Sequence, residues 1–291
     1  MSKPSDRGNL EQALDPGLYV VATPIGHASD ITSRALRVLA GVDAIACEDT
    51  RVTAKLLAIH GISTSLTPYH DHNARAAGPV LVKRLQAGER IALVSDAGTP
   101  LISDPGYRLV RACADAGVPV VPIPGPSAVL AALCVSGLPT DRFLFAGFAP
   151  PRAGPRRRFL TELAAVPATL VLMESPRRLA TSLADMADVL GGRDAMVARE
   201  LTKLFEEIRR GPLAELADHY REAATPMGEV TVVVAPPTAP PQADGADVDR
   251  RLSEALDEAS VRSAAEKVAA ETGLPKRRLY ARALELRRRS Q

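Results

Sequence analysis

The 291-residue sequence has no tryptophan, few aromatic residues and only three cysteines. Aromatic residues make up 3% of the chain, which argues against binding of bases on a wide aromatic platform. Cys47, Cys113 and Cys134 are odd in number, widely spaced and in apolar context, so neither a disulfide framework nor a CxxC metal site is indicated. These features predict reduced thiols and a cytoplasmic protein.

Long hydrophobic runs and a large net charge are also missing. No apolar run approaches the ~20 residues that span a bilayer, and residues 1–16 lack the apolar centre of a signal peptide. We therefore expect a flexible N-terminus over residues 1–16 and no membrane partner. The formal net charge of +2 is too small to indicate nucleic-acid binding, so that interpretation depends on where the arginines cluster.

Short apolar segments alternate with amphipathic segments over residues 17–149, the predicted N-terminal domain. This alternation predicts an α/β domain with a mostly parallel sheet covered on both faces. The expected strands are residues 18–22, 43–47, 90–94 and 118–123, and the expected helices begin near Ile31 and cover residues 50–60, 73–86 and 107–116. Ser29 or Asp30 is expected to cap the first of these helices.

Prolines and glycine interrupt the alternation at residues 150–155, where we predict a domain connection. A second α/β domain is expected over residues 150–235. Its predicted strands are residues 168–173, 195–199, 204–209 and 229–234, with helices at 177–190 and 213–222. The proline-rich residues 236–247 predict a linker, and residues 248–291 a small helix-turn-helix-like tail.

The loop after the strand at 90–94 is the strongest sign of a ligand site. It reads Ser95-Asp96-Ala97-Gly98-Thr99-Pro100 and leads into Ser103-Asp104-Pro105-Gly106. Open α/β sheets bind ligands in the crevice beyond the carboxyl ends of their strands. An acidic turn rich in glycine and proline at that position therefore predicts a binding site.

Two further turns follow strands of the same predicted sheet. After the first strand, where dinucleotide-binding proteins have a G-x-G-x-x-G loop, this chain has Thr23-Pro24-Ile25-Gly26. This difference disfavours binding of a dinucleotide pyrophosphate. Ser127 follows a rigid Pro-Gly-Pro turn, where its hydroxyl either caps a helix or contacts a ligand. We expect the turns around Pro24, Asp96 and Ser127 to open on the same side of the sheet.

Other polar groups have simpler alternatives. Glu48 and Asp49 either cap a helix or handle protons or substrate beside Arg51. His70 and His72 lack a third ligand at a recognisable spacing, so we predict no metal.

Arginines cluster in two places. Arg152, Arg156, Arg157 and Arg158 lie beside the predicted domain connection, and a second basic group lies in the tail between residues 276 and 289. A solvated charged surface is one interpretation, and binding of RNA phosphates is the other. Two separate basic clusters favour an RNA substrate over a small acid.

The segments at residues 18–32, 48–51, 95–106 and 124–128 resemble the tetrapyrrole methylase superfamily. Within it, the chain is similar to the branch of ribosomal RNA small subunit methyltransferases I, from about residue 18 to residue 235. The basic tail resembles a helix-turn-helix segment that many members carry. Members that methylate tetrapyrroles carry a glycine-rich first loop that this chain lacks, which argues against such a substrate.

The resemblance implies two α/β domains with S-adenosylmethionine bound in the cleft between them. It also implies a homodimer that methylates the 2′-hydroxyl of cytidine 1402 of 16S rRNA in the 30S particle. Carried over by position, the cofactor-binding residues would be Pro24, Ser95, Asp96, Ala97, Ser127, Ala128, Met173, Leu201 and Gly228.

Methyl transfer to a ribose hydroxyl needs orientation of the two reactants and a group that accepts the proton. The candidates are Glu48, Asp49, Glu200 and Lys203, and we expect Arg51 and Lys203 to hold RNA phosphate or ribose. Two alternatives stay open, a methyltransferase of a tetrapyrrole or other small molecule and a non-catalytic ribosome-binding factor.

Overall fold

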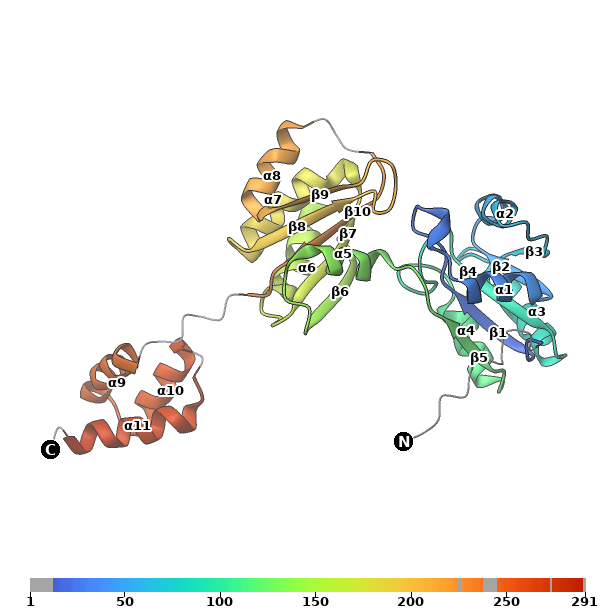
Figure 1. Ribbon diagram of the computed structural model, residues 1–291. Helices are drawn as coiled ribbons and strands as arrows, with labels where there is room; N and C mark the ends of the chain where they lie inside the picture. Colours follow the sequence, from blue (N-terminus) through green and yellow to red (C-terminus); the bar gives the residue numbers. More distant parts are fainter. Residues whose placement is uncertain (1–12, 224–226, 238–244, 273, 290–291) are drawn as a thin grey trace, which may run out of the picture. The chain divides into compact units, whose positions relative to one another are not determined.

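The computed structural model describes residues 13–223, 227–237, 245–272 and 274–289. The chain divides into two compact units, Met1–Pro236 and Pro237–Gln291 (Figure 1). Of the predicted flexible N-terminus, residues 1–12 lie outside the described residues, as do residues 238–244 of the predicted linker. The predicted linker extends too far, because a helix already begins at Gly245.

The first sheet is wholly parallel, as predicted, and has the strand order β3-β2-β4-β1-β5. Its strands are β1 (Gly17–Val21), β2 (Ala44–Cys47), β3 (Leu66–Pro68), β4 (Arg90–Val94) and β5 (Val120–Ile123). The sequence analysis missed β3, a short strand at the edge of the sheet. The central strands are continuous apolar runs because both of their faces are buried.

Four helices cover the two faces of this sheet (Figure 1). They are α1 (Ser33–Gly41), α2 (Thr50–Ile59), α3 (Ala74–Gln86) and α4 (Tyr107–Asp115), and a short 3-10 turn, η1 (Ala28–Asp30), precedes α1. Alternate residues of one strand serve opposite faces: Ala92 of β4 packs with the α1 and α2 side, and Leu93 with the α3 and α4 side. The prediction that Ser29 or Asp30 caps α1 is wrong: the cap is Thr32, whose hydroxyl accepts a hydrogen bond from the Ala35 amide.

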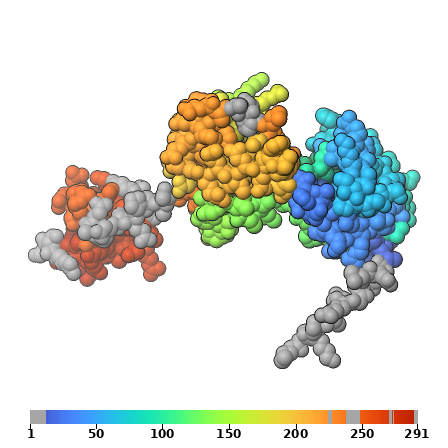
Figure 2. Space-filling view, turned by 45° about the horizontal axis from the view of Figure 1, so that its top comes forward, coloured from blue at the N-terminus to red at the C-terminus, as the bar shows by residue number. Residues whose placement is uncertain are grey.

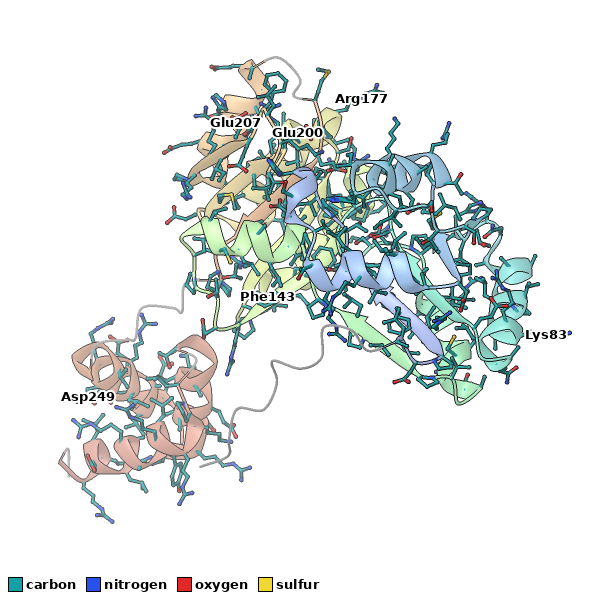
Figure 3. The ribbon with its side chains drawn as sticks, turned by 45° about the vertical axis from the view of Figure 1, so that its right-hand side comes forward. Lys83, Phe143, Arg177, Glu200, Glu207 and Asp249 are labelled. Atoms are coloured by element: carbon teal, nitrogen blue, oxygen red, sulfur yellow. The ribbon has the colours of Figure 1, made fainter. Side chains whose placement is uncertain are left out.

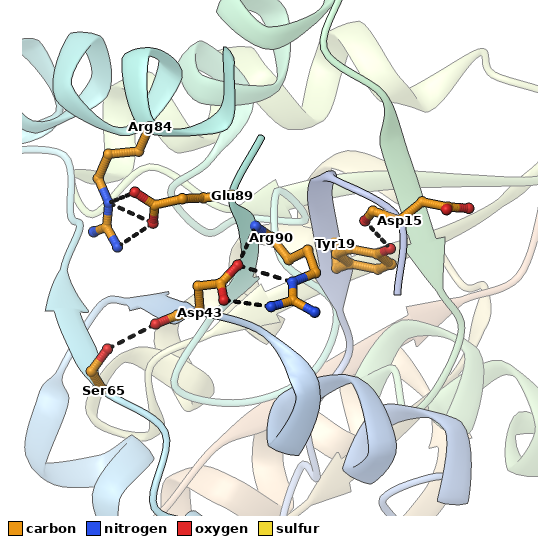
Figure 4. Close-up of polar contacts among 7 residues, drawn as sticks. All are labelled: Asp15, Tyr19, Asp43, Ser65, Arg84, Glu89 and Arg90. Atoms are coloured by element: carbon orange, nitrogen blue, oxygen red, sulfur yellow. Dashed lines mark hydrogen bonds and ion pairs between the residues drawn. The ribbon is translucent and has the colours of Figure 1, made fainter. Parts of the chain in front are cut away.

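Ion pairs fasten the first sheet at the amino ends of its strands (Figure 4). Asp43, which precedes β2, accepts hydrogen bonds from the backbone and the guanidinium of Arg90, the first residue of β4. These hydrogen bonds lower the pKa of Asp43 to about 2. The polar side chains at the amino ends of these strands are therefore paired with one another.

The second sheet is mixed, with the strand order β6-β7-β10-β8-β9. Its strands are β6 (Phe143–Phe148), β7 (Thr169–Glu174), β8 (Asp194–Arg199), β9 (Glu207–Pro212) and β10 (Val230–Val234). Only β6 and β7 run parallel in this sheet, and the helix α6 (Ala153–Ala164) connects them. Hydrophobic periodicity marks a strand without giving its direction, so the sequence predicted an α/β domain here but no strand directions; β8 turns back into β9 through residues 200–206 without a helix.

Helices also cover both faces of the second sheet. α5 (Ala128–Ser136) packs on one face, and α6 (Ala153–Ala164), α7 (Leu179–Leu190) and α8 (Leu213–Glu222) pack on the other, with the turn η2 (Pro176–Arg178) before α7. The predicted strand at 204–209 begins too early, because Leu204 and Phe205 are exposed in the preceding loop.

The predicted domain connection at residues 150–155 is contradicted by the pairing of β6. This strand belongs to the second sheet, and α5 packs on that sheet. The chain therefore passes from the first sheet to the second between β5 and α5. Residues 150–155 instead lead into α6, whose first turn contains Pro155. A proline is tolerated there because the amides of the first turn have no partner within the helix.

The described residues of the second unit form three helices, α9 (Gly245–Glu258), α10 (Val261–Thr272) and α11 (Lys276–Arg289). They close on an apolar core that includes Leu252, Ala265 and Leu279. Figure 2 shows these helices (red) packed into one small body. The predicted helix pair and turn correspond to α10 and α11, although Gly273 in the turn lies outside the described residues. None of the described helices in either unit is long and apolar enough to cross a membrane.

A buried ion pair joins α6 to α7, and we predict that removing one of its charges destabilises the protein. The Arg156 Nε donates to Asp185 Oδ2 at 2.7 Å, and both side chains are more than nine-tenths buried. Asp185→Asn should therefore lower the free energy of unfolding by about 3 kcal/mol, because the arginine would stay buried without its counter-charge. Urea unfolding followed by circular dichroism measures this loss.

Asp188→Asn is the matched control. Asp188 lies on the same helix and also pairs with Arg157, but it is exposed, so the loss should stay below about 1 kcal/mol. Equal losses for the two variants would show that burial of the pair has no special energetic role.

Candidate functional site

Three loops meet at the carboxyl ends of the first sheet's strands, on the same side, as predicted. The loop after β1 and the loop after β4 are joined by backbone hydrogen bonds in both directions between Thr23 and Gly98, at 2.9 and 3.0 Å. The Thr99 hydroxyl of the second loop donates to the carbonyl of Pro126, in the third loop. These contacts hold the loops as one wall.

This wall borders a cavity of about 340 Å³, which lies within the range typical of small-molecule sites. The residues that line it from the loops after β1 and β4 are Ile25, Asp96, Ala97, Gly98, Thr99, Ile102, Ser103 and Asp104. The residues that line it from α5 and the second sheet are Ser127, Ala128, Val129, Phe148, Met173, Glu174, Ser175, Pro176, Gly228, Glu229, Val230 and Thr231.

Most of the predicted cofactor-binding residues border this cavity. They are Asp96, Ala97, Ser127, Ala128, Met173 and Gly228. Ser127 also caps α5, since its hydroxyl accepts the Leu130 amide at 3.5 Å, so the two roles considered for it are compatible.

The other three predicted residues do not line the cavity. Ser95 is buried, and its hydroxyl donates to the carbonyl of Ala97, which shapes the loop. Leu201 packs with the core between α5 and the second sheet. Pro24 lies next to Thr23, the residue that is bonded to Gly98.

The cavity is acidic. Asp96, Asp104, Glu174 and Glu229 are among its lining residues, whereas lysine, arginine and histidine are absent from the lining that the structure describes. The pKa of Asp104 is raised to about 6, chiefly by burial and also by the negative charges of Asp96 and Glu229, against a hydrogen bond with Ser95 that lowers it. Glu174 pairs with Arg178 and Glu229 with Lys203, so Asp96 and Asp104 are the carboxyls that favour a positively charged ligand.

Asp104 was not among the predicted functional residues. It belongs to the motif after β4 that marked the site, but its burial and its charged neighbours come from segments far apart in the sequence. A carboxyl with a strongly raised pKa in a cavity is a common property of functional residues.

Residues 200–203, in the loop after β8, contact Gly26 in the loop after β1. A Cβ atom on Gly26 would lie 2.5 Å from the Lys203 side chain and 2.7 Å from the Thr202 hydroxyl, so only glycine fits. The amide of His27 donates to the same hydroxyl at 3.1 Å. This contact joins the first loop of the wall to the second sheet.

Lys203 is held by two carboxylates. Its Nζ donates to Glu200 Oε1 at 2.8 Å and to Glu229 Oε2 at 2.9 Å. Burial lowers the pKa of Lys203, but these two hydrogen bonds outweigh it and raise the pKa above its usual value. Lys203 therefore stays protonated at neutral pH, which argues against its predicted role as proton acceptor.

Of the other three candidates, Glu200 has its pKa lowered by its hydrogen bond with Lys203, whereas Asp49 and Glu48 differ from each other. Asp49 caps α2, and its hydrogen bonds with Arg51 lower its pKa to about 2, so it is a poor proton acceptor. Burial raises the pKa of Glu48, and the charges of Asp96 and Asp104 raise it further. Glu48 is thus the better placed of the two to take a proton.

The arginines predicted to bind RNA separate into two pairs. Arg156 is buried against Asp185, and Arg157 pairs with Asp185 and Asp188, so these two hold α6 on α7. Arg152 and Arg158 are exposed and make no ion pair with the residues that the structure describes. The exposed Arg51 guanidinium pairs with Asp49.

Comparison with known families agrees with this architecture. The family described as Tetrapyrrole (Corrin/Porphyrin) Methylases matches residues 17–217, and the family described as RsmI C-terminal HTH domain matches residues 242–287. Among solved structures, the methyltransferase CobJ has a TM-score of 0.57 at 20% identity, over 76% of this chain and 94% of its own. At that identity the likeness shows the fold alone.

Two curated relatives match over nearly the whole chain. The Ribosomal RNA small subunit methyltransferase I of Mesorhizobium japonicum is 56% identical over 275 residues, 94% of this chain and 93% of that protein. The protein of the same name from Pseudomonas aeruginosa is 49% identical over 272 residues, 92% of this chain and 96% of its own. As its loop motifs predicted, this chain belongs to the tetrapyrrole methylase family, in the branch of the ribosomal RNA small subunit methyltransferases I.

Proposed function

We propose that this protein uses S-adenosylmethionine to methylate the 2′-hydroxyl of cytidine 1402 of 16S rRNA, in the 30S particle, as a cytoplasmic homodimer. The names of the relatives that match over nearly the whole chain support a small-subunit rRNA substrate. The observation that carries the cofactor part is the cavity with four acidic residues and no basic residue in its described lining.

The cavity residues fit this cofactor in both charge and polarity. S-adenosylmethionine carries an electrophilic methyl group on a positively charged sulfonium, which the carboxylates of Asp96 and Asp104 would attract. The apolar surfaces of Val129 and Met173 would hold its uncharged parts, and the Ser127 hydroxyl would fix its orientation. A uroporphyrin-III C-methyltransferase from Thermus thermophilus, solved in complex with S-adenosyl homocysteine, has the same fold (TM-score 0.52, 20% identity, 75% of this chain and 96% of its own).

The reaction forms a bond between the ribose oxygen and the methyl carbon and breaks the bond between that carbon and sulfur. The hydroxyl proton must leave as the oxygen is methylated, so a nearby carboxylate that is ionised at neutral pH would assist. Asp104, with a pKa of about 6, meets this requirement and lines the cavity, and its charge is one of those that raise the pKa of Glu48. Lys203 would instead fix Glu200 and Glu229 at the edge of the cavity.

Exposed arginines would bind the phosphates of the RNA. Arg152 and Arg158 keep their charges available at the surface, and Arg51 can exchange its exposed contact with Asp49 for a phosphate. The buried Arg156 is withdrawn from this role, because it would have to leave Asp185.

The first prediction concerns the reaction itself. Purified protein with labelled S-adenosylmethionine should transfer the label to 30S particles that lack this modification, and mapping should find it on the 2′-oxygen of cytidine 1402. Label on a tetrapyrrole instead would support the small-molecule alternative. Binding of the cofactor without transfer to any acceptor would favour a non-catalytic ribosome-binding factor.

The second prediction concerns the charge of Asp104. A cationic ligand favours the ionised carboxylate, so the affinity for S-adenosylmethionine should rise by roughly tenfold as the pH increases through about 6, and then level off. Asp104→Asn should remove this rise, as measured by calorimetry between pH 5 and pH 7. Asp115→Asn, an exposed carboxylate on α4, is the control that should keep it.

The third prediction concerns the tail. Arg277 and Arg278 are exposed on α11, whereas Arg282 pairs with Asp249 within the unit. Replacing both Arg277 and Arg278 by alanine should weaken binding to 30S particles by roughly tenfold at low salt and reduce its salt dependence. Binding of S-adenosylmethionine should not change, and unchanged affinity for the particle would exclude this surface from RNA binding.

A further inference from the structure

Phe148 is an exposed aromatic side chain in a protein that has only five phenylalanines and no tryptophan. It is the last residue of β6, an edge strand of the second sheet, and its ring lines the cavity with 55% of its surface exposed. A ring that is this exposed stays in contact with water until a ligand covers it, and removing its apolar surface from water is favourable.

A β-bulge directs Phe148 toward the cavity. Phe145 pairs with Val171, but Gly147 pairs with the next residue, Leu172, so Ala146 is an extra residue in β6. Side chains three positions apart point to opposite faces of a regular strand, whereas the bulge returns Phe148 to the face of Phe145, beside Met173. Gly147 permits this with a φ of 68°.

A second irregular segment exposes an apolar side chain to the same cavity. Ile102 is 42% exposed and lies between Leu101 and Ser103, which are not glycines yet have φ values of 75° and 64°. Such left-handed residues cost free energy and are concentrated at functional sites. The two segments are neighbours, because a Cβ atom on Gly147 would lie 3.7 Å from the Ser103 hydroxyl.

We propose that Phe148 and Ile102 form a clamp for the base of the nucleotide that is methylated; this inference rests on the proposed function. A nucleotide within folded rRNA must be turned out of its helix before its ribose can enter a cavity, and its exposed base then needs a surface to replace lost stacking. A phenyl ring provides that surface for any base.

The exposure of the two side chains favours the acceptor base over the adenine of the cofactor. Of the predicted cofactor-binding residues that line the cavity, Ala97, Ser127, Ala128 and Met173 are less exposed than Ile102 and Phe148, whereas Asp96 and Gly228 are exposed as well. The clamp therefore lies nearer the solvent, where a macromolecular substrate would arrive. One ring and one aliphatic side chain suffice for a single base, which is consistent with the low aromatic content.

The kinetic test compares two phenylalanines of the same strand. Phe148→Ala should lower kcat/KM for 30S particles by about tenfold and leave the Kd for S-adenosylmethionine unchanged, while Phe148→Tyr keeps most of the activity. Phe143→Ala is the control: Phe143 is 44% exposed at the other end of β6, and in Figure 3 it lies well away from Glu200. Equal effects of the two alanine variants, or a matching loss of cofactor affinity, would overturn the clamp.

A fluorescence test uses the absence of tryptophan. Phe148→Trp and Phe143→Trp each introduce a single reporter, to be titrated with cytidine monophosphate and with ribose 5-phosphate in the presence of S-adenosylhomocysteine. Cytidine monophosphate should quench the tryptophan at 148 and not that at 143, and ribose 5-phosphate should quench neither. Absence of quenching at 148 would reject the clamp.

The two proposals fail in different ways. Wild-type protein that methylates 30S particles but shows no quenching through Phe148→Trp would refute the clamp and keep the proposed function. Wild-type protein that transfers no methyl group to 30S particles would refute the proposed function, whatever the fluorescence shows.

Discussion

The contact of the loop 200–203 with Gly26 is the constraint on which the cavity depends. The first sheet contributes loops that are already joined to one another, but the second sheet must reach them across this contact. Lys203 holds the loop in shape through Glu200 and Glu229, and the missing side chain of Gly26 lets it approach. Without that approach, the residues on the two sides of the cavity would not face one ligand.

The sequence was sufficient to predict the loops of the site and four strands of the first sheet, β1, β2, β4 and β5, because each depends on local patterns. Buried parallel strands are apolar throughout, and the turns after β1, β4 and β5 carry proline, glycine and polar residues at the strand ends. The change between sheets was misplaced because Pro155 looks like a helix breaker, although it occupies a helix's first turn. β6 was not among the predicted strands, because its bulge interrupts the regular alternation of a strand.

The roles of charged residues could not be predicted in the same way, because they depend on partners distant in sequence. Arg156 looks like one of four surface arginines until Asp185 is found beside it. Lys203 looks like a base or a phosphate ligand until two carboxylates are found on its ammonium group. Asp104 belongs to a recognised motif, yet only burial and the approach of Glu229 reveal its raised pKa.

Glu200 and Gly228 share one volume. A Cβ atom on Gly228 would lie 2.1 Å from Glu200 Oε1, so the space that a side chain at position 228 would need is the space that the glutamate occupies. Evolution can therefore not vary these two positions independently. A larger residue at 228 would displace the Glu200 carboxylate from Lys203, and Glu229 alone of these two carboxylates would then hold the ammonium group.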